Sequence, residues 1–283
     1  MRSKGRLPRL LTAGLVAAAL AACEAGSESP PAEDAAGACE EPSVTSEPSL
    51  SDHWQGAEAE MARAAARGDA EGVRAARAQG AGANAISARG MPMLLWPVAH
   101  PCVPGFEALL AAGADPNAAY ESGGNEGRIG SLLARQEDRR FLDAALAAGM
   151  DANARSASGE AVLWAAIVAG RWTAVQALIE AGADPDMPQH EDGWYTPLTF
   201  YSRGAFDKVV WLLENGADAG RVRRKTTEDG RVEARPYILQ NIFYYEVDES
   251  YPALAAAQAR AQEIVREQGH ERPPRPARYD ARR

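Results

Sequence analysis

Four histidines are the side chains best suited to catalysis or metal binding in this sequence: His53, His100, His190 and His270. No two of them form the HExxH pattern, which places a pair of zinc ligands on one helix. The stretch from His190 to Asp192, taken together with His100, offers donor atoms for a metal, but its spacing matches no known ligand pattern. The G-x-S-x-G pattern of serine hydrolases is absent as well. We therefore expect neither catalysis nor a metal or other cofactor, and no enzyme activity.

Cys23 is the residue with the clearest predicted chemistry. A basic stretch, Arg2 to Arg9, precedes an apolar run that ends at Ala22 and is shorter than the roughly 20 residues that span a bilayer. This order of charge, apolar run and small residues before a cysteine resembles the lipobox of bacterial lipoproteins. The resemblance implies that residues 1–22 are a signal peptide and that Cys23 is acylated; Glu24, where an aspartate would favour the inner membrane, points to the outer membrane. The alternative is a short helix with a buried cysteine.

The segment after the signal, residues 23–52, is predicted to be an acidic, disordered tether. Residues 24–52 contain eight acidic and no basic side chains, too little apolar surface to fold alone. With Cys23 acylated, Cys39 and Cys102 remain, an even number that suits an oxidising compartment. They form either a disulfide or two separate thiols, because spacing alone does not fix disulfide geometry.

A short phrase that recurs every 33 to 36 residues predicts the fold. Its glycines are Gly80, Gly113, Gly149, Gly182 and Gly216, and such a period indicates stacked repeats. The stretch from Gly159 to Gly170 resembles the ankyrin pattern G-x-T-P-L-H-x-A-A-x-x-G, and the next unit contains Thr196-Pro197-Leu198. The chain is thus similar to bacterial, periplasmic ankyrin-repeat lipoproteins. This resemblance implies an all-α solenoid of about five to six helix-turn-helix units with projecting β-hairpin loops.

The period also gives the predicted boundaries. The ankyrin domain covers residues 53–270, and an Arg- and Pro-rich tail, expected to be frayed, follows at 271–283. Gly170 and Gly182 are expected to end helices in the left-handed conformation. The predicted units are 53–85, 86–118, 119–154, 155–187 and 188–220, closed by a divergent cap at 221–270.

Three places depart from the repeat. Pro97 and Pro101 predict a short or kinked helix in the second unit, with Cys102 in the turn that follows. The glycine-rich loop at 120–128 lacks the flanking elements of a phosphate-binding loop and is interpreted as a flexible loop tip. The long loop at 221–236 is either a projecting hairpin with a turn at Asp229-Gly230 or an unstructured insertion.

In the ankyrin family the loop tips and first helices bind other proteins, so the resemblance implies a protein-binding face. Large side chains that are not packing positions of the repeat are expected along it: Tyr120, Arg155, Glu160, His190, Trp194, Tyr195 and Arg203. Trp194 and Tyr195 are either interface anchors or, in the case of Trp194, packing for the next loop.

The net charge of −9 disfavours nucleic acid and suggests a basic protein partner. We expect a monomer that binds another periplasmic protein while its lipid anchor holds it on the periplasmic face of the outer membrane. One function that fits is that of an immunity or inhibitor protein against a secreted antibacterial effector. The alternative is an envelope-maintenance scaffold, or a partner of a resident enzyme in oxidative-stress defence.

Overall fold

The computed structural model describes residues 39, 49–122, 125–190, 193–226 and 230–276, so the predicted signal peptide and Cys23 lie outside the described residues. The described part is mostly helical and has two small two-stranded sheets, which confirms the mostly-α class. Within it, no helix combines the length and apolarity needed to cross a bilayer. The elements are α1 (Leu50–His53), α2 (Gly56–Ala66), α3 (Ala70–Ala78), η1 (Met93–Leu95), α4 (Trp96–Ala99), α5 (Val103–Ala111), β1 (Ala119–Ser122), β2 (Asn125–Arg128), α6 (Ile129–Leu133), α7 (Arg140–Ala147), α8 (Val162–Val168), α9 (Trp172–Glu180), α10 (Pro197–Tyr201), α11 (Phe206–Glu214), β3 (Arg223–Thr226), β4 (Val232–Arg235), α12 (Tyr237–Tyr244) and α13 (Pro252–Glu267).

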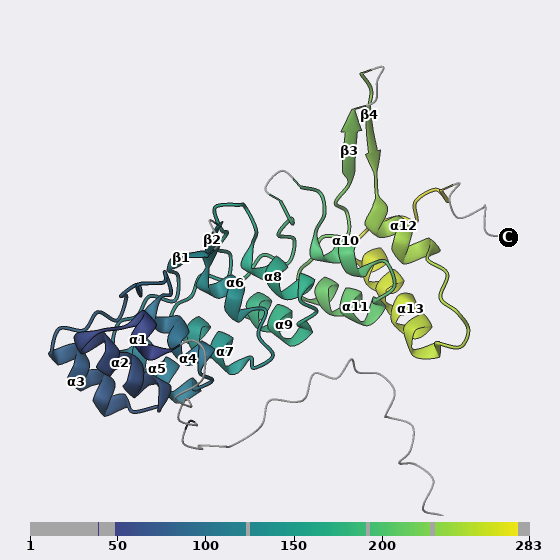
Figure 1. Cartoon of the computed structure of the whole chain (residues 1–283). Helices are drawn as coiled ribbons and strands as arrows, with labels where there is room; N and C mark the ends of the chain where they lie inside the picture. Colours follow the sequence, from purple (N-terminus) through teal and green to yellow (C-terminus); the bar gives the residue numbers. More distant parts are fainter. Residues whose placement is uncertain (1–38, 40–48, 123–124, 191–192, 227–229, 277–283) are drawn as a thin grey trace, which may run out of the picture.

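The helices are arranged as successive pairs. Helix α2 contacts α3, α4 contacts α5, and the same holds for α6 with α7, α8 with α9, α10 with α11 and α12 with α13. The pairs follow one another in a row, and the two hairpins leave the row on the same side (Figure 1). Each stretch predicted as one unit therefore contains one helix pair.

Hydrogen bonds between the recurring phrases join neighbouring pairs. Asn84 donates from Nδ2 to the carbonyl of Gly113 at 3.0 Å, and its Oδ1 accepts from the backbone N–H of Asp115 at 2.7 Å. Asn117 and Asn153 repeat both bonds one and two phrases further on. An asparagine suits this position because its amide is both donor and acceptor.

The fourth phrase has Asp186 where its predecessors have asparagine. Its Oδ2 accepts from the backbone N–H of Asp218 at 3.0 Å, so the accepting bond is kept. A carboxylate has no proton to donate, and Oδ1 is buried with no hydrogen-bond partner. Burial raises the pKa of Asp186 to about 6, although the Asp218 N–H and Arg221 act in the opposite direction.

The core runs along the row and is built mainly from alanine, leucine and a few large aromatic rings. In α8, six of the seven residues are buried, and the indole of Trp164 donates to the carbonyl of Met187 at 2.8 Å. Gly170 and Gly182 follow α8 and α9 with φ of 72° and 96°, which confirms the predicted left-handed helix ends. Small alanines such as Ala165 let the pairs approach closely.

The two hairpins test the loop predictions. Strands β3 and β4 pair antiparallel, which confirms a hairpin at 221–236 over an unstructured insertion. The predicted turn includes Asp229, which lies outside the described residues. The flexible loop tip predicted at 120–128 is wrong, because Ala119–Ser122 and Asn125–Arg128 form a second antiparallel hairpin. The register pairs Ala119 with Arg128 and Tyr120 with Gly127.

The second unit is as predicted, whereas the tail is not. Helix α4 has four residues, Cys102 caps the next helix, and Pro104 stands in its first turn. The tail was expected to be frayed from residue 271, but Pro273 is buried and its carbonyl accepts a 2.6 Å hydrogen bond from the hydroxyl of Tyr244. The guanidinium of Arg272 also lies 4.8 Å from the Tyr244 ring centre. Arg-aromatic contacts, rather than repeat packing, hold 271–276 in place; residues 277–283 lie outside the described residues.

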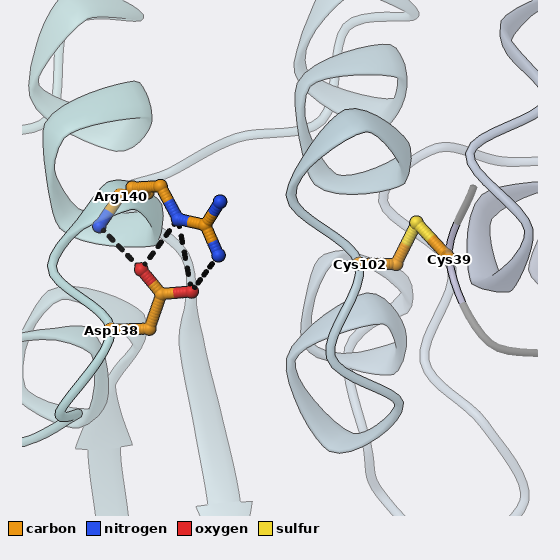
Figure 2. Close-up of a disulfide and its surroundings, with 4 residues drawn as sticks. All are labelled: Cys39, Cys102, Asp138 and Arg140. Atoms are coloured by element: carbon orange, nitrogen blue, oxygen red, sulfur yellow. Dashed lines mark hydrogen bonds and ion pairs between the residues drawn. A yellow bond between two sulfur atoms is a disulfide. The ribbon is translucent and has the colours of Figure 1, made fainter. Parts of the chain in front are cut away.

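A disulfide joins Cys39 to Cys102, so the structure has the first of the two states that the sequence left open. The Cα atoms are 5.3 Å apart, and the bond links residues 63 positions apart in the chain (Figure 2). Cys102 is almost fully buried where α5 begins. The bond therefore fixes Cys39 of the predicted tether against the first helix pairs.

Reduction of this disulfide is expected to lower the free energy of unfolding by about 1–2 kcal/mol. That is the low end of the usual range, because Cys39 lies outside the helices and holding it in place has its own entropic cost in the folded state. Thermal melts of the same sample with and without a reductant measure the effect, with the Cys39→Ser/Cys102→Ser variant as control. A reductant effect that persists in this variant would contradict the assignment.

Candidate protein-binding groove

A groove lies between the β1–β2 hairpin, helix α6 and the loop that precedes α8. Its volume is about 650 Å³. Two of the side chains predicted for the binding face, Tyr120 and Glu160, line it, and the structure thus brings together residues 40 positions apart. The other side chains that define the groove come mainly from the end of β2 and from α6 and the turn after it: Arg128, Ser131, Leu132 and Arg135.

The wall formed by Tyr120 depends on a glycine in the facing strand. Tyr120 on β1 pairs with Gly127 on β2. A Cβ built on Gly127 would lie 2.8 Å from the Tyr120 ring, so the ring lies directly over the glycine backbone. Tyr120 is half-buried and also packs against the core, which fixes its orientation beside the groove. A larger side chain at 127 would displace this ring.

Charged groups at the groove are held in place by specific contacts. Arg135 donates to Glu160 at 2.5 Å, and their side chains are 42% and 38% exposed. Arg128 donates to the backbone carbonyls of Arg155 and Asn117, each at 3.1 Å. Two guanidinium groups thus face one carboxylate along the lining, so the groove has a local positive charge although the chain as a whole is acidic.

Ser131 provides an unsatisfied polar group in the groove lining. Its residue surface is 7% exposed, and its hydroxyl has no hydrogen-bond partner. Buried hydroxyls are nearly always paired with protein or water, because leaving them unpaired costs roughly 1–3 kcal/mol. Ser131 belongs to the groove lining, but its hydroxyl oxygen is buried, so a ligand group reaches it only when neighbouring side chains move.

Arg155 forms several hydrogen bonds within the protein. Its guanidinium donates to the carbonyls of Gly159 and Pro188, at 2.6 and 2.9 Å. It therefore joins two neighbouring loops, while its own carbonyl accepts from Arg128. Through these bonds Arg155 holds the loops beside the groove in place.

Trp194 and Tyr195 belong to an aromatic cluster and are half-buried. The Tyr195 ring stacks on Trp164 with centroids 5.8 Å apart. Trp194 lies 5.4 Å from the ring of Tyr237, and the guanidinium of Arg223 is 4.8 Å from its centre. Trp194 thus makes the contacts of the alternative in which it packs on the next loop. Part of the Trp194 ring and part of the Tyr195 ring remain exposed to solvent.

The remaining predicted residues are exposed and lie outside the groove lining. His190 and Arg203 are both exposed, in the loop before α10 and after its C-terminus. Phe200 on α10, which was not among the predicted residues, is 38% exposed and its ring meets those of Trp164 and Tyr195. The sequence could have indicated Phe200, because it is an aromatic residue on α10, the first helix of its pair, on the side that faces the loops. Nothing in the sequence around Ser131 and Arg135 indicates that they line a groove.

The described residues contain no group of three or more His, Cys, Asp or Glu side chains arranged to hold a metal ion. Of the residues considered for such a site, Glu191 and Asp192 lie outside the described part. His100 is buried against the ring of Trp96, with centroids 4.4 Å apart. What the groove offers is recognition chemistry: guanidinium groups, a hydroxyl and a fixed aromatic ring.

Comparison with known proteins gives one partial likeness. No family model matches the chain. Over 128 residues the chain is 35% identical to Protein PhlB of Serratia liquefaciens, and this stretch is 44% of the present chain and 53% of that protein. The match therefore spans about half the length of the curated relative.

Proposed function

We propose that this protein is a lipid-anchored ankyrin stack that binds another periplasmic protein through the groove between Tyr120 and Glu160. The observation that carries this proposal is the groove itself, which combines a fixed aromatic wall, local positive charge and the unpaired hydroxyl of Ser131. Aromatic and arginine side chains are the groups that dominate binding energy at protein interfaces. An extended polypeptide supplies the carbonyls and N–H groups that such a groove can bind.

The periodic structure supports the ankyrin part of the proposal. Helix pairs recur with the sequence period, and asparagine hydrogen bonds at successive phrases join one pair to the next. A single pair cannot bury its apolar side alone, so such units gain stability by stacking. The two hairpins on one side of the row correspond to the projecting loops of the resemblance (Figure 1).

We further propose that acylated Cys23 holds the domain at the outer membrane, and that the bound protein is a secreted effector that the domain neutralises. The disulfide between Cys39 and Cys102 supports an oxidising compartment such as the periplasm. An envelope scaffold or an oxidative-stress partner is the second possibility. The identity of the neighbouring gene would distinguish the two functions. An effector gene favours immunity, and a catalase gene favours oxidative-stress defence.

Leu132→Asp is expected to weaken partner binding at least about tenfold, because it places a charge in the groove; Leu132 is half-buried and packs against the edge of the core, so melting curves accompany the affinities. The intact protein first captures its partner from envelope extract, and calorimetry with the identified partner then gives the affinity. Tyr251→Asp, at a residue 58% exposed between α12 and α13, is the matched control and should bind normally. Equal affinity of the wild type and Leu132→Asp, with unchanged melting curves, would rule out the groove.

A further inference from the structure

No described residue of the β3–β4 hairpin belongs to the hydrophobic core or packs against it. The hairpin stands out from the row beyond the neighbouring loops (Figure 1). All four residues of β4 are exposed, and Val232 is 65% exposed. A two-stranded ribbon that buries so little is not needed to complete the packing of the stack. Its presence calls for another use.

The base of the hairpin is nevertheless held firmly. Arg223 at the start of β3 lies over Trp194, and Trp194 in turn packs against Tyr237 at the start of α12. These contacts join the hairpin to the loop of the preceding unit and to the helix that follows. The contacts at its base therefore fix the direction of the ribbon. A partner that binds there avoids the entropic cost of ordering it.

The hairpin is also basic in an acidic protein. Residues 221–235 contain six basic and three acidic side chains, whereas the whole chain carries −9. Arg224 is exposed and has no ion-pair partner among the described residues. The register places Arg223 opposite Arg235 and Arg224 opposite Ala234, so basic residues lie on both faces of the ribbon near its base.

We propose that the base of the β3–β4 hairpin binds an acidic surface of the protein that occupies the groove. This inference rests on the proposed function and adds the chemistry of the partner. The net charge of the chain suggested a basic partner, but the charge that a partner meets at this surface is the local one. A protein that lies along the loops contacts the hairpin from the side, where Arg223, Arg224 and Arg235 are placed.

A membrane surface fits the hairpin less well. A flat bilayer would meet the far end of a projecting ribbon before its base, where Arg223, Arg224 and Arg235 lie. A folded protein can reach this basic base beside the loops. We therefore take a protein carboxylate cluster as the occupant.

The rarity of lysine allows a direct test. The chain has only Lys4, Lys208 and Lys225, and Lys225 lies on β3. A carbodiimide joins a carboxylate to a lysine amine without a spacer, so it reports which lysine an acidic ligand touches. The probe is an N-acetylated peptide of ten glutamates, mixed with the full chain, and the products are mapped by mass spectrometry. We expect at least fivefold more cross-link at Lys225 than at Lys208, whose ammonium lies 5.3 Å from both the Trp172 and Tyr201 ring centres.

Charge reversal provides the control. Arg224→Glu with Arg235→Glu, both at the base of the hairpin, should reduce the Lys225 cross-link at least fivefold. Arg67→Glu with Arg74→Glu, the same change of net charge just after α2 and on α3, should not. Equal losses in the two double variants would overturn the inference. So would binding to phosphatidylglycerol vesicles that depends on the hairpin arginines without any cross-link to the peptide.

The captured partner separates this inference from the proposed function. With that partner, the hairpin double variant should weaken binding at least tenfold at low salt and reduce the dependence of affinity on salt. A partner whose affinity falls with Leu132→Asp but not with the hairpin variant would overturn the hairpin contact and leave the groove standing. A partner insensitive to Leu132→Asp would contradict the groove instead.

Discussion

Replacing Gly105 with alanine is expected to destabilise the protein by about 3 kcal/mol, the upper end of the usual cost of overfilling a packed core. Gly105 is buried in the first turns of α5, where that helix crosses α2. A Cβ at this position would lie 1.6 Å from the carbonyl oxygen of Ala65. Backbone cannot move aside as a flexible side chain does, so the two helices must separate.

Chemical denaturation of Gly105→Ala beside the wild type measures this loss. Gly82→Ala is the matched control, because a Cβ there meets nothing closer than 3.4 Å and the position needs no left-handed backbone. We expect the control to change stability by less than about 0.5 kcal/mol, as for most uncrowded surface substitutions. Wild-type stability of Gly105→Ala would mean that α2 and α5 do not pack as described.

Asp186→Asn is expected to stabilise the protein, by about 3 kcal/mol at pH 8. Burial raises the pKa of Asp186 to about 6, from an ordinary value of 3.8, and each unit of pKa difference corresponds to about 1.4 kcal/mol. The side chain is only 10% exposed, so solvent screens little of this cost. Asparagine removes the charge and supplies the donor that Asn84, Asn117 and Asn153 use at the other phrases.

The pH dependence follows from the direction of the shift. Because the folded pKa lies above the unfolded one, the stabilising contribution of protonated Asp186 is complete below pH 3.8 and is lost as the pH rises through about 6. The advantage of Asp186→Asn should therefore be small at pH 4 and full at pH 8. Arg221, 3.7 Å away, favours the charged form, whereas Asp184 and Asp218 oppose it.

The measurement is the difference in unfolding free energy between variant and wild type across this pH range. Taking the difference cancels the pH-dependent stability that other carboxyls contribute to both proteins. Asp138 is one of them, because its hydrogen bond with Arg140 lowers its pKa (Figure 2). Asn153→Asp is the converse control and should lose stability as the pH rises. A pH-independent difference for Asp186→Asn would show that Asp186 titrates normally.

The sequence predicted what recurs and missed what depends on contacts between distant residues. The glycines and asparagines of the repeated phrase predicted the helix pairs, because the same local geometry is needed in every unit. By contrast, Tyr120 lies over Gly127 only after the two strands pair, and Trp194 meets Tyr237 from 43 positions away. The buried hydroxyl of Ser131 likewise results from the packing around it, and no pattern marks such a residue.

If Cys23 is the acylated anchor that we propose, the disulfide between Cys39 and Cys102 also limits how far from the bilayer the domain can reach. Cys39 lies 16 positions after Cys23, so chain geometry limits that span to about 55 Å. Without the bond the first attached residues are those of α1, and the limit rises to about 95 Å. With that anchor, oxidation would shorten the tether and attach it at the α2–α5 end of the row. Under that proposal, one disulfide sets the volume around the anchor within which the groove can meet a partner.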